Sequence, residues 1–394
     1  MRHDFDTVID RRGTHSEKWD GMEDRYGVSQ EDGLAMWVAD MEFRPPPEVN
    51  EAIRRAADHG IHGYPGNLAP YHQAIVDWMD RRHGWAIQPE WISTTHGIVN
   101  AVHLLVQAFC QPGDRVVVQP PVYYPFFGAV TFNGCELINN PLVQVDGRYR
   151  MDLEELDRLS GPAPKMLILC SPHNPGGRVW NRAELEELAE FCLERDILMV
   201  SDEIHHDLVY EGYSHTVLAS LGPEVARRVI TCTSASKTFN LAGTMTGNVI
   251  ISDESMRRRF QLQMTRCGIN FPNRFGPLTA TAAYNHGDQW LEDLLVYLQG
   301  NRDRVDRVVK DGLPGVTSMP LEGTYLAWLD LWGTGLTMEE IIRCVQEDAR
   351  LALNHGPTFG SGGDKRMRLN FACPRSMLDH ALERLVSAFR DRGN

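Results

Sequence analysis

The stretch of sequence that decides the fold runs from Lys165 to Glu203 and reads KMLILCSPHNPGGRVWNRAELEELAEFCLERDILMVSDE. It begins with a short apolar run, KMLILC (165–170), and a turn-rich loop, SPHNPGG (171–177), follows. A second apolar run, ILMVSDE (197–203), ends the stretch. Short apolar runs separated by a helical segment are typical of βαβ units, in which the two strands lie parallel in one sheet.

The segment between these two runs has the pattern of a helix. Asn181 with Glu184 three residues later resembles a capping box, and the apolar residues of AELEELAEFCLER (183–195) recur at helical spacing. Further apolar runs predict three more strands and one apolar helix: the strands 115–119, 228–234 and 248–252, and the helix 97–110. Together these elements predict an α/β fold with a mostly parallel central sheet flanked by helices.

The two ends of the chain differ in character from its middle. Residues 1–45 are polar and irregular, and such an arm is expected to pack against other structure because alone it could not bury a core. Residues 46–290 are expected to form a large α/β domain, and residues 291–394 a smaller α+β domain that the arm joins. In this last part we expect strands at 325–331 and 366–371 and helix starts at Thr337 and Ser376.

Composition excludes several classes of protein. Of 394 residues, 53 are acidic and 39 basic, which gives a net charge of −14, and no segment concentrates Lys or Arg, so nucleic acid is not an expected partner. No apolar run reaches the roughly 20 residues that span a bilayer, and the first residues lack the apolar region of a signal peptide. We therefore expect no membrane contact and a cytoplasmic location. The eight cysteines are scattered without a CxxC pair, and the sequence predicts neither a disulfide framework nor a metal site.

Lysine is scarce, with five residues (Lys18, Lys165, Lys237, Lys310 and Lys365) against 34 arginines. Four of them lie in polar or Gly/Pro-flanked segments, where a surface position is the ordinary interpretation. Lys237, in Ser234-Ala235-Ser236-Lys237-Thr238, directly follows the strand predicted at 228–234. An amine at the end of a buried strand is desolvated and has a lowered pKa, which suits it to form a Schiff base or to act as a base.

Other predicted strand ends also carry side chains that could take part in a reaction. Ligands of open α/β sheets bind beyond the carboxyl ends of strands. Asp202 follows four apolar residues; it could be a helix N-cap, a metal ligand, or the partner that keeps a pyridine nitrogen protonated. Asn174 lies in a loop that could be an ordinary turn. Gly97 opens an apolar helix whose N-terminus could bind phosphate, although most such termini bind nothing. In combination they suggest a phosphate, a pyridinium and an aldehyde, which pyridoxal 5′-phosphate (PLP) combines.

The sequence around these residues resembles a known family. Ser236-Lys237, Asp202-Glu203-Ile204-His205, the Asn174-Pro175 loop and Tyr123, in this relative order, resemble fold-type-I PLP enzymes of the class I/II aminotransferase superfamily. More narrowly, segments spread over nearly the whole chain resemble the MalY/PatB-type cystathionine β-lyases: FDTVIDRRGTHSEKWD (5–20), ADMEF (39–43), HGYPG (62–66), CSPHNPGG (170–177), VSDEIH (200–205), TSASKTFN (233–240), TYLAWLDL (324–331) and RLNFACPRS (368–376).

The resemblance implies a set of site residues. Lys237 would hold the cofactor as a Schiff base and act in catalysis, Asp202 would pair with the pyridine nitrogen and Asn174 with the phenolic oxygen. Tyr123 would stack on the ring, with Tyr124 as the rival and core packing as the alternative for either. The phosphate would be bound by the amides of Gly97, Ile98 and Val99, the hydroxyls of Ser234 and Ser236, and Tyr64 of a second subunit, which implies a homodimer with shared sites.

Arg368 matches the arginine that binds the substrate carboxylate, a bidentate task that suits a guanidinium group, whereas Arg366 is expected to pair with surface acids. Three positions depart from the wider superfamily. Met245 stands where many aminotransferases have a phosphate-binding arginine, and His205 stands where they usually have a tyrosine; both features resemble the lyase branch. Gly176 replaces a more common threonine after Asn174-Pro175.

The expected function is therefore PLP-dependent α,β-elimination of cystathionine or another S-substituted cysteine, giving pyruvate, ammonia and a thiol. The alternative is a class I/II aminotransferase on the same scaffold, which would share every step up to the carbanion. A binding or regulatory protein that retains the fold is a further possibility, against which the intact Lys237, Asp202 and Asn174 argue. A nicotinamide dehydrogenase is disfavoured because no G-x-G-x-x-G follows a strand.

Overall fold

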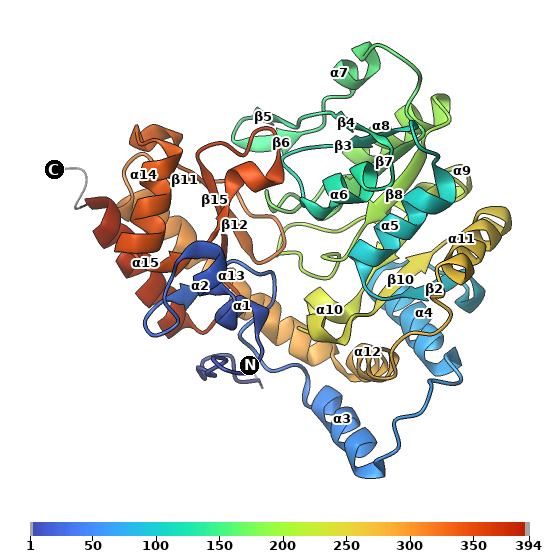
Figure 1. Ribbon diagram of the computed structural model, residues 1–394, viewed down its shortest axis with the longest axis horizontal. Coiled ribbons are helices and arrows are strands. Elements are labelled where there is room, and N and C mark those ends of the chain that lie inside the picture. Colours follow the sequence, from blue (N-terminus) through green and yellow to red (C-terminus); the bar gives the residue numbers. More distant parts are fainter. Residues whose placement is uncertain (1–2, 391–394) are drawn as a thin grey trace.

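The computed structural model describes residues 3–390, and a seven-stranded sheet lies at its centre (Figure 1). The strand order is β2-β10-β9-β8-β7-β3-β4. β10 runs antiparallel to both of its neighbours, whereas β9, β8, β7, β3 and β4 are parallel to one another, which confirms the mostly parallel sheet. The strands are β2 (Ile92–Thr95), β3 (Arg115–Val118), β4 (Glu136–Asn139), β7 (Met166–Cys170), β8 (Leu198–Asp202), β9 (Val229–Thr233) and β10 (Gly247–Ile250).

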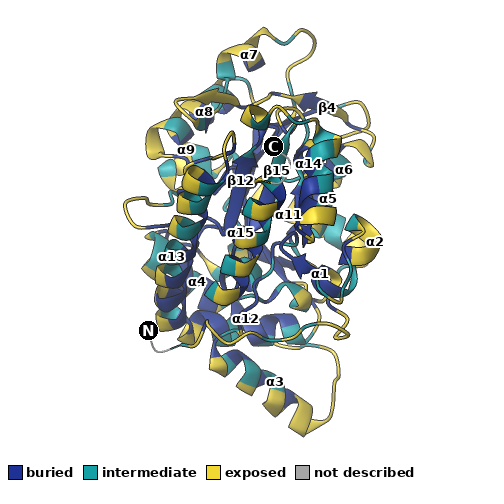
Figure 2. Ribbon diagram, turned by 90° about the vertical axis from the view of Figure 1, so that its left-hand side faces the viewer, coloured by how far each residue is buried: buried dark blue, intermediate teal, exposed yellow. Residues whose placement is uncertain are grey.

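Helices cover both faces of this sheet, which explains why its strands are continuous apolar runs. Val116 and Val118 of β3 pack in one core cluster and Val117 in the other, as the alternation of side chains along a strand requires. One cluster includes residues of α5 (Ile98–Phe109), α6 (Pro125–Thr131) and α11 (Glu254–Arg266). The other includes residues of α4 (Ala69–His83), α8 (Arg182–Glu194), α12 (Phe275–His286) and α13 (Asp288–Gly312). Figure 2 shows the buried strands between helices whose outer surfaces are exposed.

The strand–helix–strand unit predicted from the sequence is present as β7, α8 and β8. The capping box at the start of α8 is formed: the Asn181 side chain accepts from the Glu184 amide at 3.0 Å, and the Glu184 carboxylate accepts from the Asn181 amide at 2.8 Å. Shorter elements complete this part of the chain, namely α3 (Pro47–His59), β5 (Val143–Val145), β6 (Arg148–Arg150), α7 (Leu153–Arg158) and α9 (Pro223–Ala226).

The C-terminal part has an antiparallel sheet of its own in the order β11-β12-β15-β14, and the N-terminal segment packs on it (Figure 1). Thr337 caps α14, as predicted, and α15 begins at Arg375, one residue before the predicted start. The elements are α1 (Glu17–Asp20), α2 (Met22–Tyr26), β1 (Leu34–Ala35), β11 (Thr317–Ser318), β12 (Leu326–Asp330), α14 (Met338–Arg343), β13 (Leu351–Ala352), β14 (Asn354–His355), β15 (Arg366–Asn370) and α15 (Arg375–Arg390).

The N-terminal arm is tied to this C-terminal part by β1, which pairs in parallel with β13. The predicted boundary at residue 290 falls inside the continuous helix α13, so the division into two domains stays a prediction. Among the helices of residues 3–390, none has the length and apolar character needed to cross a membrane.

Candidate active site

A cavity of about 450 Å³ opens where several loops follow the carboxyl ends of the sheet strands. Cys170 and Asp202 are the last residues of β7 and β8 and are register partners, and β9 beside them leads into Lys237. The volume lies within the range of about 300–1,000 Å³ that is usual for small-molecule sites. The cavity is lined by Ala39, His96, Gly97, Ile98, Val99, Asn100, His103, Tyr123, Cys170, Asn174, Asp202, Ile204, His205, Ser236, Lys237, Ala242, Met245 and Thr246.

Lys237 lies on the short helix α10 (Ala235–Thr238), which directly follows β9. Its Nζ reaches into the cavity and donates a hydrogen bond to the carbonyl oxygen of Ala39 at 2.7 Å. Burial lowers the pKa of Lys237 to about 8; Arg368 adds to this effect, and Asp40 and Asp202 oppose it. A substantial share of this amine is therefore neutral near pH 8, which is the state required of a nucleophile or a base.

Asp202 ends β8 with its carboxylate buried against the same cavity. Its Oδ1 accepts a hydrogen bond from the Ile204 amide at 3.1 Å, which forms a tight turn after the strand. Burial raises the pKa of Asp202 to about 7, although the Ile204 amide and Lys237 act in the opposite direction. A buried carboxylate of this kind strongly favours a cationic hydrogen-bond donor as its neighbour.

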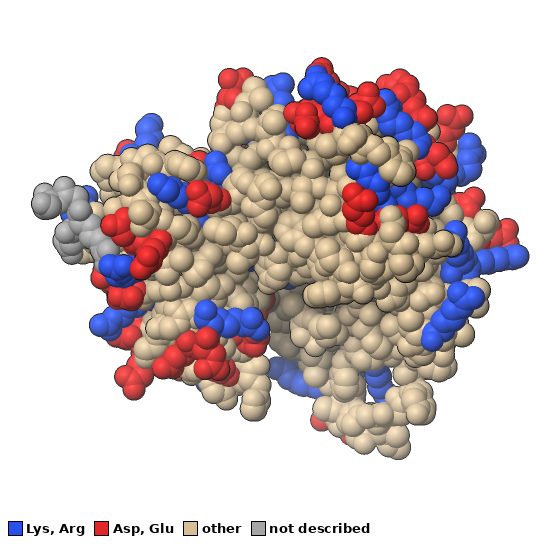
Figure 3. Space-filling model, turned by 45° about the horizontal axis from the view of Figure 1, so that its top comes forward, with Lys and Arg blue, Asp and Glu red and all other residues tan. Residues whose placement is uncertain are grey.

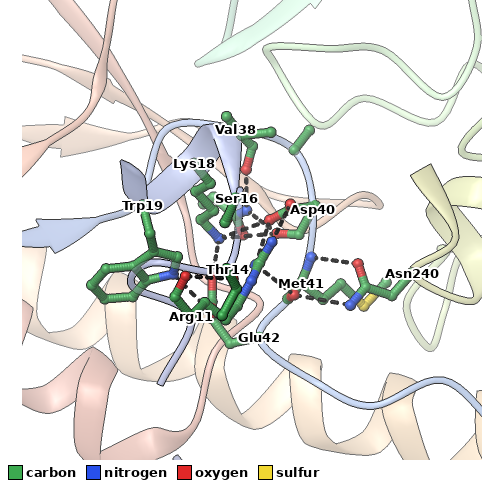
Figure 4. Close-up of polar contacts among 12 residues, drawn as sticks. Arg11, Thr14, Ser16, Lys18, Trp19, Val38, Asp40, Met41, Glu42 and Asn240 are labelled. Atoms are coloured by element: carbon green, nitrogen blue, oxygen red, sulfur yellow. Dashed lines mark hydrogen bonds and ion pairs between the residues drawn. The ribbon is translucent and has the colours of Figure 1, made fainter. Parts of the chain in front are cut away.

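Ala39 is the residue of segment 37–43 that lines the cavity, and a network of charges holds this segment in place (Figure 4). Lys18 binds Glu42 at 2.6 Å and Asp40 at 3.3 Å, while Arg11 binds Asp40 at 2.8 Å. The interpretation of Lys18 as a surface lysine was wrong, because its side chain is only 1% exposed. Burial alone would lower the pKa of Lys18, but the carboxylates of Glu42 and Asp40 outweigh it and raise the pKa, so this amine stays charged.

Asn174 and Arg368 lie in direct contact, as the loop after β7 meets β15 of the C-terminal sheet. One Nη1 hydrogen of Arg368 is donated to Asn174 Oδ1 at 2.9 Å, and Nη2 donates to the Trp37 carbonyl at 2.7 Å and to Asn354. The guanidinium is buried, and its Nε has no hydrogen-bond partner among the described residues. Arg368 does not itself line the cavity but contacts Asn174, which does, and its unpaired Nε is a donor left for an anion. Arg366, on the same strand, binds Asp330 at 2.7 Å, in line with the role expected of it.

Two ring side chains line the cavity beside Asp202. Tyr123 packs edge-to-face on Phe126 with ring centroids 5.8 Å apart, and burial raises its pKa, so its hydroxyl stays protonated. Tyr124, the rival candidate, is 41% exposed and does not line the cavity. His205 is buried against Tyr325, and burial together with the positive charges of Lys237 and Arg368 lowers its pKa well below the usual value. It is therefore neutral at physiological pH.

The N-terminus of α5 faces the cavity. Gly97 has φ +89°, a conformation that glycine adopts readily. The first intrahelical hydrogen bond runs from the Ala101 amide to the Gly97 carbonyl. The amides of Ile98, Val99 and Asn100 are therefore the free donors of the first helical turn. Ser236 and Thr246 line the same region. Ser234 does not, because its hydroxyl donates to the Thr246 carbonyl at 2.7 Å and accepts from the Ser236 amide.

Tyr64 lies outside this cavity, on the loop between α3 and α4, with 93% of its surface exposed. Its ring centroid is 6.4 Å from that of Phe271, and Ile61 nearby on the loop is also exposed. Sequence reasoning gave no role to several lining residues, namely Ala39, His96, Asn100, His103 and Thr246. The ADMEF segment was a family signal that could have drawn attention to Ala39, whereas nothing in the sequence pointed to His103.

The donor set of the cavity fits PLP. An amine of lowered pKa suits the aldehyde, a buried carboxylate that needs a cationic partner suits the pyridinium, and the free amides at a helix N-terminus suit the phosphate. These three features lie around one cavity large enough for a small molecule. The fold and the site together define a class of protein, the fold-type-I PLP enzymes.

Comparisons with known proteins agree with this class. The family described as "Aminotransferase class I and II" matches residues 33–385. Cystathionine beta-lyase PatB of Bacillus subtilis is 42% identical, covering 98% of this chain and 99% of its own. Protein MalY of Escherichia coli is 31% identical with the same coverage. The crystal structure of cystalysin from Treponema denticola, whose description names a pyridoxal 5′-phosphate cofactor, is similar at a TM-score of 0.95 with 36% identity over 100% of both chains.

The chain therefore belongs to the class I and II aminotransferase family and, within it, to the group that includes PatB and MalY. The resemblance drawn from the sequence is confirmed.

Proposed function

We propose that this protein is a PLP-dependent carbon–sulfur β-lyase that acts on cystathionine or another S-substituted cysteine. The relatives at 42% and 31% identity over nearly the whole chain support this activity, since the first is named a cystathionine β-lyase. The observation that carries the proposal is the pair formed by Lys237 and Asp202. One supplies a partly neutral amine and the other a buried carboxylate that favours a cationic partner, and both line one cavity.

When bound, PLP supplies an aldehyde that condenses with amines and a pyridinium ring that accepts the electron pair left at the substrate α-carbon. Lys237 would hold this aldehyde between turnovers, and its Nζ is the amine that would take the substrate α-proton as general base. Asp202 would hold the ring nitrogen in its protonated state by accepting its N–H. Asn174 would bind the phenolic oxygen, and Tyr123 would pack against the ring.

Arg368 binds the substrate carboxylate and so fixes which bond at the α-carbon faces Lys237. The phosphate is held by the amides of Ile98 and Val99 and by the Ser236 hydroxyl, without an arginine at position 245. Loss of the α-proton followed by departure of the β-thiolate, which takes up a proton, leaves an unsaturated amine. Water hydrolyses this amine to pyruvate and ammonia, which balances the reaction.

We also propose that Tyr64 reaches the phosphate in the site of a second subunit. Its almost full exposure on the loop between α3 and α4, together with exposed Ile61 and Phe271, supports this role. On the face that Figure 3 shows, charged side chains gather toward the rim and the middle carries few, which suits contact with a second copy. We accordingly propose a homodimer with shared sites that works in the cytoplasm.

The test is pyruvate release from L-cystathionine by the PLP-loaded enzyme without any keto-acid acceptor. We expect stoichiometric pyruvate, ammonia and homocysteine. Lys237→Ala is expected to lose at least about 10²-fold in turnover, the usual contribution of a general base, together with the yellow absorbance of the bound cofactor. Lys310→Ala, on the exposed side of α13, is the control and should retain both. Turnover that requires a keto acid and releases no pyruvate would instead identify an aminotransferase.

A further inference from the structure

A buried cluster of titratable side chains lies behind the turn that follows β8, and the proposed reaction does not use it. We call it the histidine cluster; it consists of His83 at the end of α4, Glu203, His206 and Asp207 in the turn, and His215. The side chains of Glu203, His206 and Asp207 are fully buried, and those of His215 and His83 are 2% and 6% exposed.

Both carboxylates of the histidine cluster are paired with histidines. Glu203 Oε2 lies 2.8 Å from His215 Nε2, and Asp207 lies 2.8 Å from His83 Nε2 and 3.4 Å from His206 Nε2. Among the described residues, neither carboxylate has an ion pair with Lys or Arg. Glu203 also accepts hydrogen bonds from the Ser201 hydroxyl and the Leu218 amide, and Asp207 accepts further bonds, but all these donors are neutral. Positive charge stabilises a buried carboxylate further, and either protons on the imidazoles or a bound cation can supply it.

The geometry of His206 distinguishes between these two possibilities. Its Nδ1 lies 2.6 Å from the Glu203 carbonyl oxygen, so Nδ1 carries a hydrogen and Nε2 is left as an acceptor. That Nε2 is buried without a hydrogen-bond partner and faces Asp207 Oδ2, a second acceptor, across 3.4 Å. This separation is long for a hydrogen bond. It is close to the distance of about 3.3 Å between neighbouring ligand atoms around a tetrahedral zinc ion with bonds of about 2.05 Å.

The surroundings orient these groups as they do in known metal sites. The ligand atoms of His83, His206 and Asp207 lie within 4.8 Å of one another, and the two imidazole centroids are 4.6 Å apart. His83 Nε2 lies 2.8 Å from Asp207 Oδ1, a hydrogen-bond distance, so the ion would take the place of the hydrogen between these two atoms. Metal-binding histidines usually donate their other N–H to a carbonyl or carboxylate, as His206 does, and metal-binding carboxylates accept further hydrogen bonds. Asp207 accepts such bonds from Trp78 Nε1 at 3.0 Å and from Thr238 Oγ1 at 2.6 Å.

We propose that His83, His206 and Asp207 form a binding site for a divalent transition-metal ion of the zinc class. Two imidazoles and one carboxylate select zinc, cobalt or nickel over magnesium or calcium, which prefer all-oxygen sites. The ion would cross-link α4 to the turn after β8. Through the Thr238 hydroxyl on Asp207 it would also fix the end of α10, the helix that carries Lys237. Its role is structural, because His83, His206 and Asp207 do not line the cavity and lie apart from the reacting groups.

The experiment uses the untagged PLP-loaded protein, stripped of metal on a chelating resin and titrated with Co²⁺ alone. We expect a single equivalent to bind with the intense visible bands of a low-symmetry cobalt–imidazole site, and Zn²⁺ to displace it. His206→Asn should weaken Co²⁺ binding at least about 100-fold, the upper range for loss of groups that merely support a ligand. His355→Asn, a histidine of β14 that contacts Gln346, is the matched control and should bind normally.

Binding that persists unchanged in His206→Asn would overturn the proposal, because it would arise from the cofactor or another site. Absence of a bound equivalent in the wild-type protein would overturn it as well and would assign protons to the histidine cluster. If His206→Asn fails to fold, X-ray absorption of the cobalt-loaded wild type decides, since imidazole ligands give a distinctive outer-shell scattering that oxygen ligands lack. These readouts are independent of pyruvate release, so they stand or fall separately from the proposed lyase activity.

Discussion

Replacement of Asp202 by Asn is expected to stabilise the cofactor-free protein while it weakens the enzyme. The carboxylate is buried, and the Ile204 amide is the hydrogen-bond donor that it has. Burial raises its pKa from 3.8 to about 7, which means that the folded state disfavours the ionised form. An acid whose pKa is raised on folding costs stability as pH rises from the unfolded pKa to the folded pKa. The cost is therefore absent well below pH 4 and complete above pH 7.

The magnitude follows from these two pKa values. One pKa unit corresponds to about 1.4 kcal/mol, so the linkage relation gives a penalty of about 1 kcal/mol near pH 4.5 and about 4 kcal/mol near pH 8. The amide introduced by Asp202→Asn has nearly the same shape as the carboxylate and carries no charge. Relative to the wild-type apoprotein, the free energy of unfolding of Asp202→Asn should thus rise by about 3 kcal/mol more at pH 8 than at pH 4.5.

The assay is denaturant unfolding of both apoproteins at the two pH values. Lys237 is present in both proteins, so its own titration contributes equally to each. In the PLP-loaded proteins the order should reverse at pH 8, because the ring nitrogen supplies the cation that the carboxylate lacks. Asp202→Asn should then release PLP more readily and lose turnover. A difference between variant and wild-type apoprotein that is independent of pH would refute the reasoning, since it would mean that Asp202 titrates as an ordinary exposed acid.

Two further perturbations test the charge network around Lys18 and the shared sites of the proposed dimer. Lys18→Met leaves the buried Glu42 with one of its two cationic partners, and should lower the free energy of unfolding by about 3–5 kcal/mol in a denaturant titration. The control Lys310→Met should change the free energy of unfolding little. An equally small effect of Lys18→Met would contradict the argument from burial. Tyr64→Ala and Lys237→Ala, each nearly inactive alone, should recover about a quarter of wild-type activity after subunits are mixed, because half of the dimers pair the two variants and each has one intact site. No recovery, with mixed dimers verified by mass spectrometry, would place Tyr64 outside the partner's site.

Most of the fold could be predicted from the sequence because local and tertiary signals agreed. The capping box of α8, the glycine before α5 and the apolar runs of β3, β7 and β8 each fix an element, and both faces of the sheet are covered as their hydrophobicity requires. The antiparallel direction of β10 could not be predicted, because an apolar run does not indicate whether its strand is parallel or antiparallel to its neighbours. It follows from the connection after α10, which returns the chain beside β9.

The site was harder to predict than the fold because its residues meet through long-range contacts. The carboxyl-end rule brings Asn174, Asp202 and Lys237 together, since all three follow neighbouring strands. No comparable rule places Ala39, whose carbonyl reaches Lys237 from the N-terminal segment. Ser234 shows the converse: its position in a family motif suggested a phosphate contact, but the start of α10 uses its hydroxyl as a helix cap.

The two buried lysines show why burial alone does not identify a reactive amine. Lys18 is more deeply buried than Lys237, yet the carboxylates of Glu42 and Asp40 lie within 3.3 Å of its Nζ and raise its pKa. Lys237 has an uncharged carbonyl at 2.7 Å instead, and its pKa falls to about 8. Both contacts come from the same segment, where Ala39 and Asp40 are consecutive residues. Lys18 and Arg11 bind the carboxylate of Asp40, which does not line the cavity. The Ala39 carbonyl is therefore the group of this segment that contacts Lys237.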